Sequence, residues 1–392
     1  MGNYWDPQSS SPNLPRYAPV NSGKSWTSGT NTFNGSSSNI YNLRAGLDRV
    51  IGGTGACNIA FIQDSLGIGF DGTVGDPNGG FNLNFAFPSA FRDSLNALGY
   101  TTGGPGTMCT TVNPSAMAAN YGFSWTGGVA PLNYFLFTAT GGTITWVSPK
   151  ACTHIDIAYS NQNSNFSYTV DGGAPNNVVP TGAATNAKLT VPGVPLANVV
   201  HTVVITCGAT HALTAINGYS LTGLMTHNLS QGGTTIAWAA GGPNINWGDT
   251  SVSTNLPGAR IAALPANLDA VFFMMGANDK LHLIDPATIV AGAETFLNTR
   301  FPGVLAGTTD VILGTSYHIP PSNPASDSNW EQTLNLYYQL AARRNWRLFD
   351  WNDRLGGVGQ ALLNNLLGAD STHPIWGVSV QYGKSLSNNL VL

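Results

Sequence analysis

Charged residues are scarce in this sequence: Asp, Glu, Lys and Arg make up 9% of the 392 residues, against about a quarter in an average soluble protein. The formal net charge is −4, and no basic stripe with interleaved aromatic residues is present. The sequence therefore gives no electrostatic basis for binding nucleic acid. Gly, Asn, Ser and Thr take the place of the missing charges, while the hydrophobic share is 42%. This composition indicates a folded protein with a neutral surface rich in hydroxyl and amide groups.

Long apolar runs and paired cysteines are also lacking. No run is long enough to span a membrane, and the polar, proline-rich start lacks the apolar core of a signal peptide, so we expect no membrane insertion and no cleaved signal. The four cysteines contain no CxxC pair, and no His/Asp/Glu cluster has metal-ligand spacing, so we expect no metal and no other cofactor. The cysteines are either free buried thiols or include a bridge between Cys152 and Cys207.

Composition and periodicity divide the chain into four segments. Residues 1–38 have few aliphatic side chains and predict an extended N-terminal arm. Residues 39–104 and 223–392 alternate strand-like and helix-like patterns, which is typical of a parallel sheet with helices on both faces. Residues 105–222 instead alternate apolar and polar side chains at every second position between Gly, Pro and Asn turns. That pattern predicts an antiparallel β-sandwich, inserted into the α/β domain and folding as a separable unit.

Three short segments carry reactive side chains. Gln63-Asp64-Ser65 follows a predicted buried strand, Gly276-Ala277-Asn278-Asp279 follows another, and Asp370-Ser371-Thr372-His373-Pro374 precedes the last predicted helix. Each one alone is more often a turn or a helix cap than a reactive site. Together they offer a serine nucleophile, an amide donor, and a histidine with a carboxylate three residues before it. Acyl transfer through serine requires these parts.

In this order the segments resemble the SGNH (GDSL-like) hydrolase family, whose members have a three-layer α/β/α fold. The family's blocks are Gly-Asp-Ser, a glycine, Gly-x-Asn-Asp and Asp-x-x-His. The resemblance implies that Ser65 is the nucleophile, His373 the base and Asp370 its partner. It also implies an oxyanion hole made by the backbone N–H groups of Ser65 and Gly232 and by the side chain of Asn278.

Some assignments stay open at this stage. Gly233 is the alternative to Gly232 for the second block. Gln63 stands where the family has a glycine, and whether it impairs activity is not decided by the sequence. We expect Asp279 to brace its loop rather than react. His227 and His318 follow predicted strands, and either is a candidate for the border of the site.

The resemblance implies a serine esterase that removes O-acyl groups, and O-acetyl groups above all, from a cell-surface glycan or acylated polysaccharide. The insert resembles the jelly-roll, carbohydrate-module-like domains of some such esterases. Trp125, Trp146, Tyr134 and Phe135 are either a sugar-stacking surface or sandwich core.

The low charge, the polar arm and the missing signal suggest a phage tail component in the virion, with other tail proteins as partners; an extracellular enzyme is the competing placement. The oligomeric state is open, a homo-oligomer included. Two rival functions are a non-catalytic glycan-binding tail adhesin on a degenerate hydrolase fold and a hydrolase of lipid or mycolyl esters.

Overall fold

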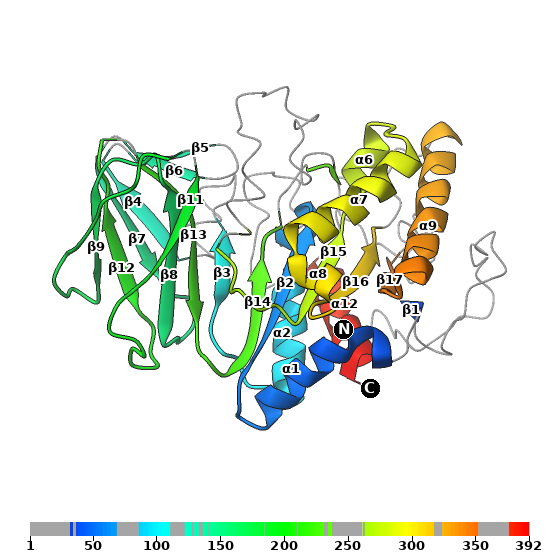
Figure 1. The fold of residues 1–392 in the computed structure, drawn as a ribbon, viewed down its shortest axis with the longest axis horizontal. Coiled ribbons are helices and arrows are strands. Elements are labelled where there is room, and N and C mark those ends of the chain that lie inside the picture. Colours follow the sequence, from blue (N-terminus) through cyan, green and yellow to red (C-terminus); the bar gives the residue numbers. More distant parts are fainter. Residues whose placement is uncertain are drawn as a thin grey trace.

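The computed structural model places two β-sheets and a set of helices around three hydrophobic cores (Figure 1). It describes residues 32–33, 37–68, 86–109, 122–127, 129–132, 136–139, 141–183, 185–209, 211–230, 234–236, 261, 263–316, 324–351 and 376–391. Among these residues the larger sheet has 12 strands and the smaller one has 5.

The larger sheet is parallel in the part formed by the α/β segments. In spatial order its parallel strands are β17 (Arg347–Asp350), β16 (Asp310–Thr315), β15 (Ala270–Met274), β2 (Ala56–Gln63), β14 (Gly223–Asn228) and β3 (Gly106–Cys109). The arm contributes β1 (Thr32–Phe33), which pairs antiparallel with β17 at the edge. Buried Val, Ile, Leu and Phe fill these strands because helices cover both faces.

Two sets of helices cover the two faces of the parallel strands. One face packs against α7 (Pro286–Arg300) and α9 (Pro324–Arg344). The other packs against α1 (Tyr41–Ile51), α2 (Phe87–Ala97) and α12 (Trp376–Val391). Shorter helices are η1 (Ser37–Ile40), η2 (Ser65–Ile68), α6 (Ala277–Leu281) and α8 (Pro302–Ala306). The three-layer α/β/α arrangement predicted from the strand–helix alternation is confirmed.

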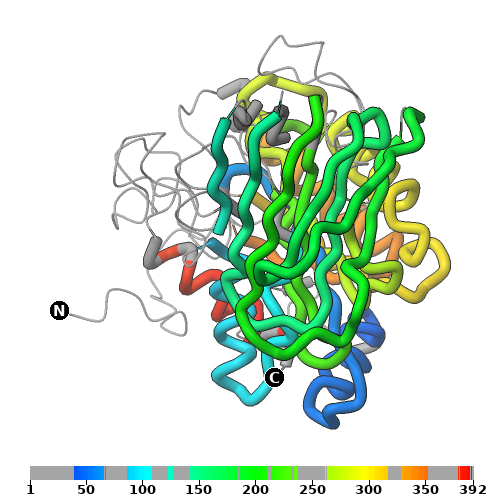
Figure 2. Tube along the Cα trace, turned by 90° about the vertical axis from the view of Figure 1, so that its left-hand side faces the viewer, coloured from blue at the N-terminus to red at the C-terminus, as the bar shows by residue number. Residues whose placement is uncertain are grey.

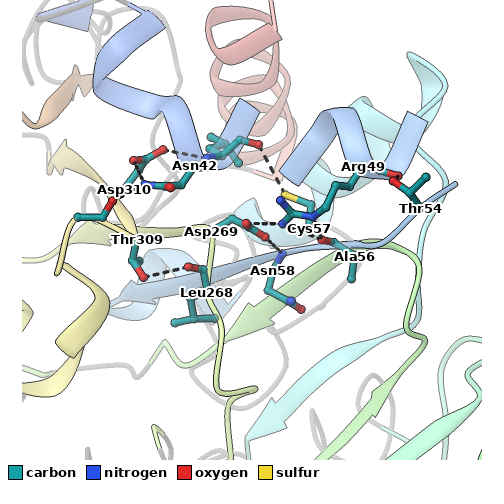
Figure 3. A network of polar contacts seen from close by, with 12 residues as sticks. Asn42, Arg49, Thr54, Ala56, Cys57, Asn58, Leu268, Asp269, Thr309 and Asp310 are labelled. Carbon is teal, nitrogen blue, oxygen red and sulfur yellow. Dashed lines mark hydrogen bonds and ion pairs between the residues drawn. The ribbon is translucent and has the colours of Figure 1, made fainter. Parts of the chain in front are cut away.

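Two aspartates, Asp269 (buried) and Asp310 (half-buried), fix α1 across the amino ends of the parallel strands (Figure 3). Asp310 accepts hydrogen bonds from the backbone N–H of Leu43 at 2.8 Å and from the side chain of Asn42 at 2.9 Å. Asp269 accepts from Arg49 Nη2 at 2.6 Å and from the N–H of Asn58 at 2.8 Å. Burial raises the pKa of both carboxyls, against these donors. This polar network belongs to the edge of the sheet opposite the carboxyl ends of its strands.

The insert is a sandwich, as predicted. Its first layer consists of β13 (His211–Tyr219), β8 (His154–Ser160), β11 (Asn186–Thr190), β6 (Leu136–Ala139) and β5 (Val129–Leu132). Its second layer is the smaller sheet, β10 (Asn176–Val178), β9 (Phe166–Val170), β12 (Thr202–Thr206), β7 (Thr143–Val147) and β4 (Phe123–Thr126). Figure 2 shows these strands from the side of the insert. Trp146 is fully buried between the layers, so it belongs to the core and not to a sugar-stacking surface. Trp125 is half-buried, and Tyr134 and Phe135 lie outside the described residues.

The first layer of the sandwich continues the central sheet, while the folding of the insert as a separable unit stays a prediction. β3 pairs antiparallel with β13 and meets β14 at Met108 and Asn228. Ala158 and Ala215 of the insert belong to the same buried cluster as the core beneath α7 and α9. Strand pairing therefore continues from the α/β domain into the insert, and β14 is not an edge strand exposed to solvent. The segment boundaries at residues 38, 104 and 222 stay predictions.

Local sequence signals fix the start of α7. Asp285 caps α7 by accepting from Thr288 N–H at 2.9 Å, and Pro286 takes the first helical position. Ser328 and Glu331 have the spacing of a capping box, yet they lie inside α9, which begins at Pro324. Proline favours the first turn and starts the helix one turn earlier.

The cysteines described with their side chains are free thiols. Cys57, Cys152 and Cys207 are all buried and unbridged, which decides against a bond between Cys152 and Cys207. Burial raises the pKa of Cys152 and of Cys207 to about 11. These side chains therefore act as small core residues and not as reactive thiolates.

Candidate active site

Two of the predicted site residues follow neighbouring strands at the carboxyl edge of the parallel sheet. β2 and β15 are neighbouring parallel strands in which Gln63 lies opposite Met274. Ser65 comes two residues after the end of β2, and Asn278 comes four residues after the end of β15. Both side chains are half-buried, while Asp64 beside Ser65 and Asp279 beside Asn278 are almost fully buried. Ser65 and Asn278 are thus partly accessible to solvent, whereas the aspartate beside each is buried. They lie at the edge where open α/β sheets bind ligands.

Ser65 is the first residue of the single-turn helix η2, which is closed by a hydrogen bond from Gly67 N–H to Asp64 C=O at 3.1 Å. The end of β14 holds this turn in place. The side-chain amide of Asn228, the last residue of β14, donates to Gly67 C=O at 2.7 Å and accepts from Ser230 N–H at 3.0 Å. Nothing in the sequence alone pointed to Asn228, because its partner lies 161 residues away.

Asn278 is presented by a turn that only glycine forms easily. Gly276 has φ 121°, a left-handed conformation, and caps α6 without a side chain. The amide of Asn278 donates one of its two N–H groups to Thr234 C=O at 3.0 Å. An asparagine amide carries a second N–H, which can donate to an oxyanion that forms beside Ser65.

Asp279 braces the loop, as predicted. Both of its carboxylate oxygens lie 3.0 Å from Ile236 N, whose N–H they accept. Together with the bond from Asn278 to Thr234, this contact holds residues 234–236 against the start of α6. Those residues follow the second block directly. Burial raises the pKa of Asp279 to about 7; the Ile236 N–H opposes the rise, and the negative charge of Asp64 adds to it.

The raised pKa of Asp279 predicts that this one group contributes a loss of fold stability as the pH rises. In the unfolded chain the carboxyl titrates near 3.8, whereas in the folded chain it keeps its proton to about pH 7. The folded state binds more protons between these values, so the free energy of unfolding falls across that window and levels off above it. The full loss is on the order of 4 kcal/mol. Asp279→Asn should remove most of this slope, because an amide cannot ionise and its oxygen still accepts from Ile236.

Urea unfolding at several pH values between 4 and 8 measures the effect, with exposed Asp48→Asn as the matched control. The wild type and the control should follow the same curve. The free energy of unfolding of Asp279→Asn should rise relative to theirs between about pH 4 and 7, because the other buried groups, His227 with its lowered pKa among them, titrate alike in all three proteins. Three parallel curves would show that Asp279 does not titrate in this range.

The remaining predicted site residues lie outside the described residues. These are Asp370, His373, Gly232 with its alternative Gly233, and the border candidate His318. Their assignment therefore stays a prediction from the family resemblance. Within the part of the chain that the structure describes, no group of three or more His, Cys, Asp or Glu side chains could hold a metal ion. In the same part, no helix combines the length and apolarity needed to cross a membrane.

His227 does not border the site, so that expectation is wrong. It lies inside β14 with 0% of its surface exposed. Thr107 N–H donates to its Nδ1 at 3.2 Å, and the Thr107 hydroxyl is 2.9 Å from the same atom. Burial, with the charge of Lys188 adding to it, lowers the pKa of His227 to about 3. A permanently neutral, enclosed imidazole joins two strands of the sheet and cannot serve as the base.

Comparisons with solved structures support the fold. A structure described as a peptidoglycan O-acetylesterase in action aligns with a TM-score of 0.64 and 14% sequence identity, covering 92% of this chain and 98% of that one. A family two carbohydrate esterase from Cellvibrio japonicus aligns with a TM-score of 0.29 and 11% identity over 72% of this chain and 96% of its own. TesA aligns with a TM-score of 0.30 and 19% identity over 43% and 79%. Likenesses as low as the last two carry no argument.

No protein-family model matches the sequence, and no curated protein matches it. At 14% identity the first likeness speaks for the fold alone. The chain shares the α/β fold of that structure, and it has a parallel central sheet and an inserted antiparallel β domain.

Proposed function

We propose that the protein is a serine esterase that removes O-acyl groups, and O-acetyl groups above all, from a cell-surface glycan. The observation that carries the proposal is the pair of half-buried side chains, Ser65 and Asn278, at the adjacent carboxyl ends of β2 and β15. A hydroxyl nucleophile beside an amide donor, both open at the edge of a rigid sheet, suits attack on an ester carbonyl.

In the proposed reaction Ser65 Oγ attacks the carbonyl carbon of the ester while His373 takes the hydroxyl proton. Asp370 keeps the imidazole in the right tautomer. The side chain of Asn278 and the backbone N–H groups of Ser65 and Gly232 donate to the oxyanion, and one such donor typically contributes about 3 kcal/mol to the barrier reduction. The glycan oxygen leaves with the proton from His373. Water then attacks the acyl-enzyme, releases the acid and restores Ser65.

A structural likeness supports the proposed substrate class, and the composition supports the proposed location. The structure aligned over nearly the whole chain is described as a peptidoglycan O-acetylesterase, and the present chain carries a sandwich beside its α/β domain. The neutral surface and the polar arm of residues 1–38 favour a phage tail or other receptor-binding component of a virion. There the arm would dock to neighbouring tail proteins and the esterase would trim the host surface. A free extracellular esterase is the competing placement.

Acetate release decides between this function and its rivals. The full-length protein is incubated with O-acetylated peptidoglycan and with acetylated xylan, and free acetate is measured against heat-treated protein. A series of nitrophenyl esters from acetate to decanoate and labelling by a fluorophosphonate accompany the assay. Acetate release with a preference for the short ester supports the proposal. A preference for the long esters would favour a lipid or mycolyl ester hydrolase. No turnover and no labelling of Ser65 would leave the adhesin on a degenerate hydrolase fold.

A further inference from the structure

Gln63, the residue two positions before Ser65, has a buried side chain without polar partners. It is 1% exposed, and neither its Nε2 nor its Oε1 has a hydrogen-bond partner among the described residues. Burying an unpaired amide destabilises a fold, and native structures contain few such groups. The presence of a buried glutamine at this position is therefore not explained by hydrogen bonding of its amide.

The side chain of Gln63 rests against the turn that carries Ser65. In β2, Ile59 and Phe61 pack into the core beneath α2 and α12, and Gln63 shares their face because strand side chains alternate. Its Oε1 lies so close to Gly67 that a Cβ added there would be 2.6 Å from it. The same Cβ would be 2.1 Å from Ser230 Oγ. Gln63 and Gly67 thus enclose Ser65 in the sequence and touch each other in space.

The turn is held from two sides by different means. From β14, Asn228 holds it by a hydrogen bond to Gly67 C=O at 2.7 Å. From β2, Gln63 contacts the same glycine through its volume alone. The hydrogen bond from Asn228 limits how far the turn can move away from β14. The contact with Gln63 limits how far the turn can sink toward the end of β2. Acting together, they fix the height of Ser65 above the sheet.

We propose that Gln63 is a positioning residue, a spacer beneath the Ser65 turn whose volume sets the place of Ser65 Oγ relative to the amide of Asn278. The inference rests on the proposed esterase function. The SGNH family resembled by this chain has a glycine at this position, so the spacer is a feature of this chain. Displacing a nucleophile by about 1 Å typically lowers turnover by about a hundredfold, which is why a contact of this kind matters to the reaction.

Two substitutions separate volume from hydrogen bonding. Gln63→Met keeps the length of the side chain and removes the amide, whereas Gln63→Gly removes the spacer. Gln162→Gly, at an exposed turn of the insert, is the matched control. Gln63→Met should keep kcat on nitrophenyl acetate within about threefold and should raise Tm, because no unpaired amide is buried. Gln63→Gly should lower kcat by tenfold to a hundredfold, leave KM within about twofold, and slow fluorophosphonate labelling by the same factor as kcat.

Crystal structures of the wild type and both variants test the spacer without any substrate. We expect the turn Ser65–Ile68 to sink toward the end of β2 in Gln63→Gly and to keep its place in Gln63→Met. An unmoved turn in Gln63→Gly, or full turnover by that variant, would overturn the proposal. So would a loss of turnover in Gln63→Met as large as in Gln63→Gly, since hydrogen bonding would then be the cause. If the wild type hydrolyses no ester, the proposed function fails, and the crystal structures still decide whether Gln63 is a spacer.

Discussion

Ser65→Ala should lower ester turnover at least about a thousandfold while the fold stays intact. Only a hydroxyl is removed, from a half-buried position on a turn whose closing bonds are made by Asp64, Gly67 and Asn228. The oxyanion donors remain, so a small residual rate above water is expected. The measurements are kcat on nitrophenyl acetate, acetate release from O-acetylated peptidoglycan, and Tm by circular dichroism.

The matched control is Ser124→Ala, an exposed serine on β4 of the insert that should leave every rate unchanged. His373→Ala should be nearly as damaging as Ser65→Ala, and the double variant should be no worse than either, because residues of one catalytic unit are strongly non-additive. A Ser65→Ala enzyme that keeps a tenth of the wild-type rate would remove Ser65 from the mechanism. A double variant far slower than both single ones would show that the two residues act separately.

The sequence predicted that Ser65 and Asn278 follow strands of one parallel sheet, but it did not predict what surrounds them. Each residue follows a short apolar strand, and parallel strands present their carboxyl ends at one edge, so the pairing of β2 with β15 could be expected. Which side chains pack beneath the Ser65 turn could not be expected, because Gln63 and Ser230, which both lie close to Gly67, are far apart in the sequence. Gln63 could be recognised as a departure from the family, but its role depends on that contact.

The environment of His227 also depends on residues that are far away in the sequence. Its position near the end of a strand indicated the border of the site. The strand that encloses it is β3, and the residue bonded to it, Thr107, lies 120 residues earlier. No pattern in the sequence indicates that β14 and β3 lie side by side. For this reason the junction between the insert and the α/β domain was the least predictable part of the fold.

Removing the insert should have the second largest effect on the enzyme. Residues 105–222 are replaced by a short Gly/Ser linker, which has little distance to span, since Gly103 N–H donates to Leu224 C=O at 2.9 Å and Leu224 N–H to Thr101 C=O at 2.7 Å. No proposed catalytic residue is deleted. The change nevertheless turns β14 into an edge strand and removes both Thr107 donors from His227.

Removing the insert then causes three losses around β14 and the core beside it. β14 loses β3, the core beneath α7 and α9 loses Ala158 and Ala215, and Leu264 C=O loses the Lys188 ammonium at 2.7 Å. β14 ends in Asn228, which holds the Ser65 turn. We therefore expect the shortened chain to unfold at a lower temperature and to hydrolyse even small soluble esters at least about tenfold more slowly, because a misplaced turn lowers kcat.

The excised insert should behave differently, because its two layers enclose a core of their own that includes Ile157, Phe166 and Ile205. It should fold as a β protein by circular dichroism, with the face of β8 and β13 that packed on the α/β domain newly exposed. Thr107→Val in the full-length chain tests the junction without excision. It removes one hydroxyl bonded to His227, and it should lower stability by about 1–2 kcal/mol. If the shortened chain keeps wild-type Tm and full turnover on nitrophenyl acetate, the insert is a detachable module. The continuous sheet is then not needed to hold β14 and Asn228 in place.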